Sequence, residues 1–210
     1  MQELIALLGI VGALAVGVVS PGPSFVMVAK VSVSTSRANG IAASLGMGLG
    51  GLAFAVAALL GLQTVLLAIP ALYTGLKVLG GLYLCYLGYR IFSGARETLE
   101  VDQTRTGERT SPYRALLLGF TTQLSNPKTA IVYASVFAAF LPSVFSPAFA
   151  FTLLCVVFGI EAGWYAIVAV LLSSTKPRSA YLSCKVWLDR TAGAVMVGLG
   201  LKLIASAPGE

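Results

Sequence analysis

The chain has 210 residues, of which 57% are hydrophobic and only 10% are charged, and its mean hydropathy is +0.89. A soluble domain carries about 25% charged residues, so this composition excludes an ordinary water-soluble fold and predicts a membrane protein. The net charge of +6 is spread over short segments between apolar runs, which indicates membrane topology and argues against a nucleic-acid partner.

Six apolar runs are long enough to be tested as membrane-spanning helices, each of which needs roughly 20 apolar residues. The first run has no basic residue before it, so we interpret it as a retained helix and not as a signal peptide. The third is the weakest, because Lys77 and Arg90 flank a short uncharged centre; it either extends both side chains to the interfaces or forms a shallow hairpin. In chain order the runs are Leu4–Ala29, Ile41–Ile69, Leu76–Phe92, Ala115–Leu141, Ala148–Leu172 and Thr191–Ala207.

The basic residues alternate between the predicted loops, and lysine and arginine near the ends of spans remain on the cytoplasmic side. The first, third and fifth loops carry them, whereas the N-terminus and the loop at 142–147 carry none. We therefore expect six transmembrane helices with both termini outside the cytoplasm. The basic residues in question are Lys30, Arg37, Arg90, Arg96, Arg105, Arg109, Arg114, Lys176, Arg178, Lys185 and Arg190.

A polar stretch at 93–114 divides the chain and predicts a cytoplasmic linker between a three-helix repeat at 1–92 and a second at 115–210. Ser20–Pro23 in the first run corresponds in position to Ser125–Lys128 in the fourth. Because three crossings are an odd number, the second repeat is inverted relative to the first, as in many transporters. The predicted fold class is an all-α polytopic membrane bundle of two inverted three-helix repeats.

Prolines predict a break in the first and fourth runs, because proline removes a backbone donor and clashes with the preceding turn. Ser20 would cap a half-helix that begins at Pro21, and Ser125 or Asn126 would cap one that begins at Pro127. Helix N-termini carry a partial positive charge, so two that face each other would bind a carboxylate, which Lys128 would strengthen. The alternative is that each proline only kinks its helix for packing.

Glu161 lies near the centre of the fifth run, where a charged carboxylate costs about 3 kcal/mol on insertion scales. The functional interpretation is a proton carrier or an ammonium ligand, and the structural alternative is an ion pair with Lys128. Trp164 and Tyr165 share its helix face and either line a cavity or pack. Glu161 is the predicted proton-coupling residue, and the predicted substrate-binding residues are Ser20, Pro21, Gly22, Pro23, Asn126, Pro127, Lys128 and Glu161.

Glycines recur at helical spacing and predict close helix packing, with a homodimer as the less favoured variant. The three cysteines are scattered and the chain has no histidine, so we expect no metal site and no cofactor. Gly46–Gly51 lacks the strand before and the Lys-Ser/Thr pair after that mark a phosphate loop. The glycines are Gly46, Gly50 and Gly61 in the second run, Gly80, Gly81 and Gly88 in the third, and Gly193, Gly198 and Gly200 in the sixth.

Four motifs resemble the LysE/RhtB family of bacterial amino-acid exporters: Ser20–Pro23, Lys77-x-x-Gly80-x-x-Tyr83-x-x-x-x-Gly88, Asn126–Lys128 and Glu161. The resemblance covers nearly the whole chain. It implies a six-span protein of the bacterial inner membrane that exports amino acids or close derivatives, in exchange for protons. The second run is mostly apolar around Ser44, which favours neutral amino acids.

The expected mechanism is alternating access by rocking of the two repeats, with the substrate carboxylate at the two helix breaks. An intramembrane enzyme is not expected, because one buried carboxylate without histidine supplies little for hydrolysis. Two alternatives are a non-catalytic membrane scaffold and a metal-ion exporter on the same fold, although a hard cation requires several oxygen ligands.

Overall fold

The computed structural model describes residues 1–20, 22–68, 70–96, 111–173 and 175–205, and every regular element among them is a helix. The all-α prediction is confirmed for these residues. The elements are α1 (Gln2–Val19), α2 (Pro23–Ser34), α3 (Arg37–Ala68), α4 (Pro70–Ser93), the 3-10 helix η1 (Gly94–Arg96), α5 (Pro112–Leu124), α6 (Pro127–Phe140), α7 (Pro147–Leu172) and α8 (Thr175–Ala205).

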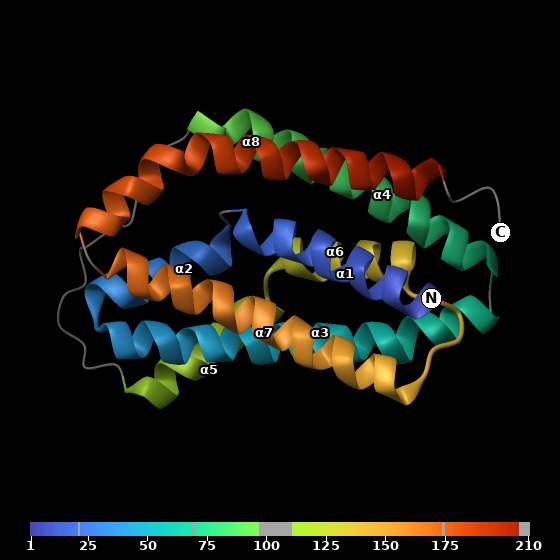
Figure 1. Ribbon diagram of the computed structural model, residues 1–210, viewed down its shortest axis with the longest axis horizontal. Coiled ribbons are helices and arrows are strands. Elements are labelled where there is room, and N and C mark those ends of the chain that lie inside the picture. Colours follow the sequence, from blue (N-terminus) through green and yellow to red (C-terminus); the bar gives the residue numbers. More distant parts are fainter. Residues whose placement is uncertain (21, 69, 97–110, 174, 206–210) are drawn as a thin grey trace.

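The helices run back and forth along one long axis, as Figure 1 shows. α3, α4, α7 and α8 each run along it unbroken, whereas α1 continues into α2, and α5 into α6, across a break. The start of α1 and the end of α8 lie at one end of the bundle, and η1 and the start of α5 lie at the other, which we call the linker end. The two halves of the chain therefore run along the long axis in opposite overall directions.

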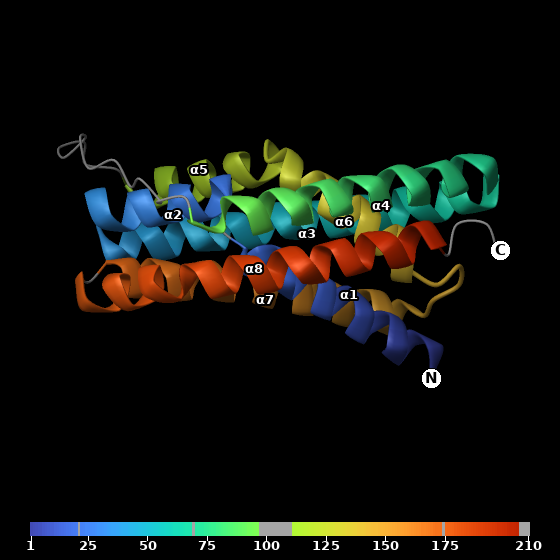
Figure 2. The ribbon, with the colours of Figure 1, turned by 90° about the horizontal axis from the view of Figure 1, so that it is seen from above.

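Helices from the two halves of the chain are interleaved. α4 lies beside α8 along its length in both views (Figures 1 and 2), and α3 packs closely on α5 and α7. Glycines make these approaches close: a Cβ on Gly88 would lie 2.5 Å from the carbonyl oxygen of Gly193, and one on Gly119 would overlap the carbonyl oxygen of Ala43. The prediction that small residues serve helix packing is confirmed at Gly88 and Gly193, and Gly119 is a further position of this kind.

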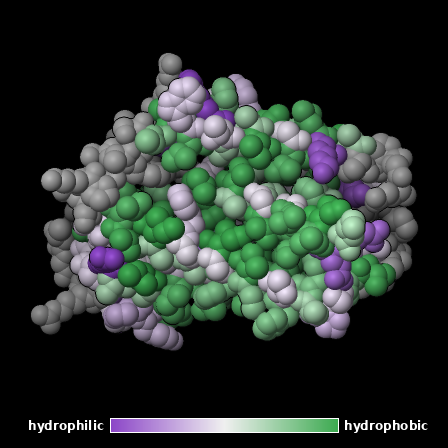
Figure 3. All heavy atoms as spheres, in the orientation of Figure 1, coloured by the Kyte–Doolittle hydropathy of each residue, from purple (hydrophilic) through white to green (hydrophobic). Residues whose placement is uncertain are grey.

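Among the described residues, three helices are long and apolar enough to cross a bilayer by length and composition: α1, the Arg37–Gly61 part of α3, and α7. The 26 residues of α7 span about 39 Å at 1.5 Å per residue, more than the roughly 30 Å of hydrocarbon in a bilayer. α2 and α6 are shorter apolar helices. Hydrophobic side chains cover the middle of the face in Figure 3, and hydrophilic ones lie toward its margins. These features are those of a multi-pass membrane protein.

Two sequence interpretations of the weaker spans are wrong. The third segment is neither bracketed by Lys77 nor a hairpin: α4 is one helix that begins at Pro70, and Lys77 lies two turns inside it and is buried. The four basic residues assigned to the fifth loop lie within α8, which already begins at Thr175: Lys176, Arg178, Lys185 and Arg190. Hydropathy alone cannot place these helix starts, because amphipathic turns continue a helix without being apolar. The predicted linker at 93–114 falls largely on 97–110, outside the described residues.

Candidate functional site

The first helix break lies where the sequence predicts it, but the cap differs. α1 ends at Val19 with Ser20 as its C-cap, and α2 begins at Pro23 with Gly22 as its N-cap in extended backbone. A residue before proline is disfavoured in helical geometry, so the helix starts at the second proline of the motif and Ser20 does not cap it. No side chain caps α2, which leaves its N-terminus available to a ligand. Pro21 lies outside the described residues.

The second break is capped from within. α5 ends at Leu124, and Asn126 is the N-cap of α6, whose first position is Pro127. The Asn126 side-chain oxygen accepts from the backbone N–H of Lys128 at 3.0 Å. The predicted cap is therefore confirmed, with Asn126 rather than Ser125 in the role. Since this cap already satisfies one donor of α6, α2 presents the more open helix N-terminus.

Five side chains form a continuous buried network that joins both breaks to Glu161. The Asn126 amide donates to Ser24 Oγ at 2.8 Å, and the Ser24 hydroxyl donates to Gln123 Oε1 at 2.7 Å. The Gln123 amide donates to Glu161 Oε2 at 2.9 Å, and the Tyr133 hydroxyl donates to Glu161 Oε1 at 2.9 Å. Every bond donates toward the carboxylate. Such a fully connected polar network can persist in an apolar interior, where an unpaired member would be costly.

The network borders an inner cavity of about 20 Å³ between α1, α2, α5, α6 and α7. This volume holds about one water molecule. Ser20 Oγ faces it and is buried without a hydrogen-bond partner among the described residues. The lining residues are Leu14, Gly17, Val18, Ser20, Gly22, Ser24, Gln123, Asn126, Lys128, Thr129, Val132, Tyr133, Glu161 and Tyr165.

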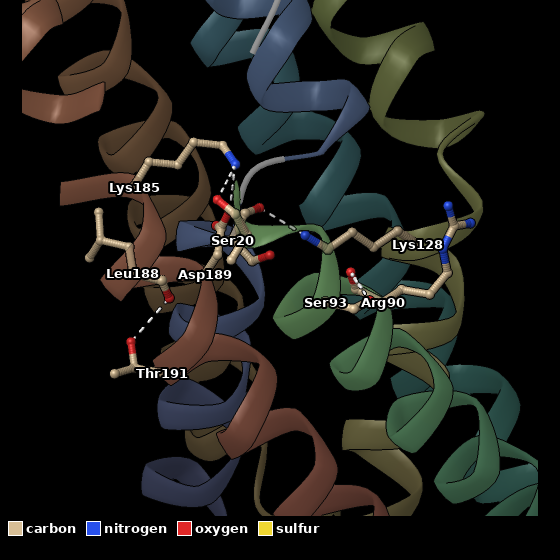
Figure 4. Close-up of polar contacts among 9 residues, drawn as sticks. Ser20, Arg90, Ser93, Lys128, Lys185, Leu188, Asp189 and Thr191 are labelled. Carbon is tan, nitrogen blue, oxygen red and sulfur yellow. Dashed lines mark hydrogen bonds and ion pairs between the residues drawn. The ribbon is translucent and has the colours of Figure 1, made fainter. Parts of the chain in front are cut away.

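Lys128 lies at the edge of this cavity and bridges the two breaks. Its ammonium donates to the carbonyl oxygen of Ser20 at 2.8 Å, as Figure 4 shows, and a Cβ on Gly22 would lie 3.4 Å from its Nζ. Within the described chain, Lys128 forms no ion pair with Glu161. The structural alternative considered for Glu161, an ion pair with Lys128, is therefore not what this structure contains. The cavity therefore holds a cation at one side and a carboxylate at another.

A second, larger space adjoins the inner cavity toward the linker end. We call it the vestibule; it has a volume of about 470 Å³ and lies between the two breaks and the α4–α8 pair. Gly22, Asn126 and Lys128 line both spaces, so Lys128 stands between them. The remaining lining residues of the vestibule are Pro23, Tyr83, Tyr86, Leu87, Arg90, Ile91, Gly94, Pro127, Lys185 and Asp189.

The structure brings most of the residues selected from the sequence to one place. Ser20, Gly22, Asn126, Lys128 and Glu161 line the inner cavity, and the motif's prolines at 23 and 127 line the vestibule. Tyr165 also lines the cavity, whereas Trp164 does not. The sequence analysis missed Ser24, Gln123, Tyr133, Lys185 and Asp189; a polar residue inside an apolar run was the available signal for Gln123.

The chain is similar in sequence to known bacterial proteins. Residues 15–207 match the LysE type translocator family. The "Threonine efflux protein" of Salmonella typhi is 34% identical over 192 residues, which cover 91% of this chain and 93% of that protein. The protein of the same name from Escherichia coli K12 is 33% identical over 193 residues, with the same coverage of both chains. An "Uncharacterized membrane protein" of Haemophilus influenzae is 27% identical over 198 residues, 92% of this chain and 93% of that protein. No solved structure matches the chain.

Proposed function

The chain belongs to the LysE type translocator family, and is thus a membrane transport protein and not an enzyme. On that premise we propose that it exports a neutral amino acid, or a close derivative, from bacteria by proton antiport. The observation that carries the proposal is the buried network, because it joins two interrupted helices to a carboxylate inside an apolar bundle. The similarity to two threonine efflux proteins supports an amino acid as the cargo.

The inner cavity offers complementary groups to both ends of a zwitterion. The substrate carboxylate would be held by Lys128 and the uncapped N-terminus of α2, and the ammonium by Glu161. Apart from Lys128 and Glu161, the lining is apolar or neutral, so no charged partner remains for a charged substrate side chain. The hydroxyls of Ser20 and Thr129 suit a small polar side chain such as that of threonine.

Glu161 would exchange a proton for an ammonium. Both of its oxygens accept a hydrogen bond, which is the pattern of an ionised carboxylate. The Tyr133 hydroxyl can rotate to accept a hydrogen bond instead, so the site can also hold a protonated carboxyl. A carboxylate buried in this way is stabilised either by a proton or by a substrate cation, and competition between the two produces antiport.

The proposed topology is six spans in the inner membrane, built from inverted repeats at 1–92 and 115–210. α1 with α2 forms one interrupted span and α5 with α6 another. The loop charges favour a cytoplasmic linker end and outward-facing termini. On this assignment the vestibule opens toward the cytoplasm, the side from which an exporter loads. Alkaline phosphatase fused at the C-terminus should be active. If the phosphatase is inactive, and a reporter that fluoresces in the cytoplasm is bright when fused at the same position, the proposed topology is the wrong way round.

The decisive experiment compares Glu161→Gln with Glu3→Gln in proteoliposomes that carry a pH gradient. Glu3 undergoes the same chemical change far from the cavity, where its carboxylate accepts from Ser146 at the start of α7. We expect proton-driven threonine movement in wild type and in the control, and none in Glu161→Gln. Wild-type coupling in Glu161→Gln would contradict the proposed role.

The competing functions predict other results. A membrane scaffold would leave intracellular threonine unchanged when cells loaded with threonine dipeptides express the protein, whereas an exporter lowers it. A metal-ion exporter would move divalent cations and not threonine. Among the described residues, Glu161 is the only carboxylate that lines the inner cavity, and hard cations take six or more oxygen ligands.

A further inference from the structure

The vestibule contains a second buried acid that the proposed transport cycle has not yet used. Asp189 lies on α8 and lines the vestibule, and only 4% of its surface is exposed. Its Oδ2 accepts from the Lys185 ammonium, one turn before it, at 2.8 Å. Lys185 also donates to the carbonyl oxygen of Ala95 at 3.2 Å, which helps to hold the ammonium in place beside the carboxylate.

The second oxygen of Asp189 points to a ligand. Oδ1 is buried and has no hydrogen-bond partner among the described residues. Buried acceptors are almost always satisfied, so an unsatisfied carboxylate oxygen on a residue that lines the vestibule calls for a functional explanation. A pair that served folding alone would gain by satisfying both oxygens. Asp189 Oδ1 can therefore accept from a cationic donor that enters the vestibule.

The position of Lys128 connects this acid to Glu161. Lys128 lines both the vestibule and the inner cavity, so it faces Asp189 on one side and the Glu161 network on the other. Figure 4 shows Asp189 and Lys185 from α8, Ser20 from the end of α1 and Lys128 from α6 pointing toward one another. Lys128 therefore has one carboxylate in each adjoining space, Asp189 in the vestibule and Glu161 in the inner cavity. A zwitterion held by Lys128 can occupy two successive positions, one beside each carboxylate.

We propose that Asp189 forms a loading subsite in the vestibule for the ammonium of the amino acid to be exported. The substrate carboxylate binds Lys128, and the ammonium binds first at Asp189 and then moves to Glu161 as the substrate pivots about Lys128 into the inner cavity. The inference rests on the proposed export function and specifies how the substrate enters. It adds Asp189 as a substrate-binding residue and Lys185 as the residue that positions it.

The test measures threonine uptake into inside-out membrane vesicles, whose outer face is the cytoplasmic one. Asp189→Asn should raise the KM for threonine by about tenfold, which corresponds to ~1.4 kcal/mol, with little change in Vmax. Because Asp189→Asn leaves the Lys185 ammonium buried without its partner, a Lys185→Met/Asp189→Leu double variant keeps the fold free of an unpaired charge. It should show the same rise in KM, and Asp189→Glu should restore a value near wild type.

Competition with half-substrates identifies which group Asp189 binds. L-Threoninol keeps the ammonium and lacks the carboxylate, whereas 2,3-dihydroxybutanoate keeps the carboxylate and lacks the ammonium. In Asp189→Asn, inhibition of uptake by threoninol should weaken about tenfold, while inhibition by the dihydroxy acid should stay as in wild type. A purely structural Asp189 would not produce this difference.

The two proposals fail in distinguishable ways. If wild-type vesicles transport threonine and Glu161→Gln abolishes transport, but Asp189→Asn keeps the wild-type KM and threoninol inhibition, only the loading subsite is wrong. A fall in Vmax at unchanged KM and unchanged threoninol inhibition would also overturn it, since Asp189 would then act only as the partner of Lys185. If wild-type vesicles take up no threonine, the export proposal fails and the loading subsite fails with it.

Discussion

Gly51 on α3 gives a direct way to disturb the buried network without removing any of its polar groups. A Cβ at this position would lie 2.8 Å from Glu161 Cγ and 2.8 Å from the Tyr133 hydroxyl oxygen, whereas ordinary van der Waals contact begins at 3.4 Å. Gly51→Ala therefore forces both side chains to move by at least about 0.6 Å. Because Gly51 itself donates or accepts nothing in the network, any effect must come from this displacement.

The size of the effect follows from the geometry. The hydrogen bond from Tyr133 to Glu161 is 2.9 Å long, and such a displacement takes it beyond the usual limit of about 3.2 Å. Loss of one hydrogen bond to a charged group costs about 1.5–3 kcal/mol, and the better helix propensity of alanine offsets about 1 kcal/mol of this. The melting temperature should therefore fall only slightly. Transport should fall about tenfold or more, because the lower bound of about 1.5 kcal/mol already corresponds to a factor of about ten if it appears as weaker ammonium binding.

The assay is threonine exchange in proteoliposomes, with the melting temperature of the purified protein measured in parallel. Gly61→Ala is the matched control, since it makes the same change on the same helix and its Cβ would meet nothing within 4 Å. Gly61→Ala should transport as wild type. If Gly51→Ala also keeps wild-type exchange and KM, the alignment of Tyr133 and Glu161 is not required and the reasoning is refuted.

Three further changes test the packing and the network. Gly119→Val should reduce the amount of folded protein and its melting temperature, because the new side chain would overlap the backbone of α3 at Ala43; Gly159→Val, whose Cβ would meet nothing within 4 Å, should not. Asn126→Ala should destabilise the protein by about 1 kcal/mol through loss of the α6 cap. Asn126→Asp keeps the cap and loses only the donor to Ser24, so it should keep the stability that the cap contributes. If Asn126→Asp is as unstable as Asn126→Ala, the capping role is contradicted. Tyr133→Phe should keep the fold, since the ring still packs on Phe54 and Phe137, but should weaken proton-driven transport; wild-type coupling in this variant would remove Tyr133 from the mechanism.

Local chemistry made part of this arrangement predictable from the sequence. The Asn126-Pro127 cap and the break before Pro23 depend on backbone rules that act within a few residues. Glu161 was conspicuous because a carboxylate inside an apolar run is costly wherever the run is placed. Each of these features is encoded by near neighbours in the chain, and hence a single sequence suffices to find it.

The partners of these residues could not be predicted in the same way. Gln123 meets Glu161 across 38 positions and Ser24 meets Asn126 across 102, so both contacts depend on how helices pack and not on local pattern. Asp189 was overlooked because the basic residues around it were interpreted as a loop. It lies inside α8 and lines the vestibule. Helix register and the interleaving of the two halves decide which polar residues face inward, and neither follows from periodicity alone.

The packing also limits how the inner cavity can open. Its volume of about 20 Å³ is far below that of the adjoining vestibule, so helices must separate before an amino acid can enter. Rocking of the two repeats as separate bodies would pull apart backbone contacts at Gly88 with Gly193 and at Gly119 with Ala43, each of which joins one half of the chain to the other. Movement of the α4–α8 pair as one unit, against the group that contains α3, α5 and α7, preserves both contacts. If α6 moves with α3, α5 and α7, the same movement would change the distance from Asp189, on α8, to Lys128, on α6, and would couple loading of the substrate to opening of the site.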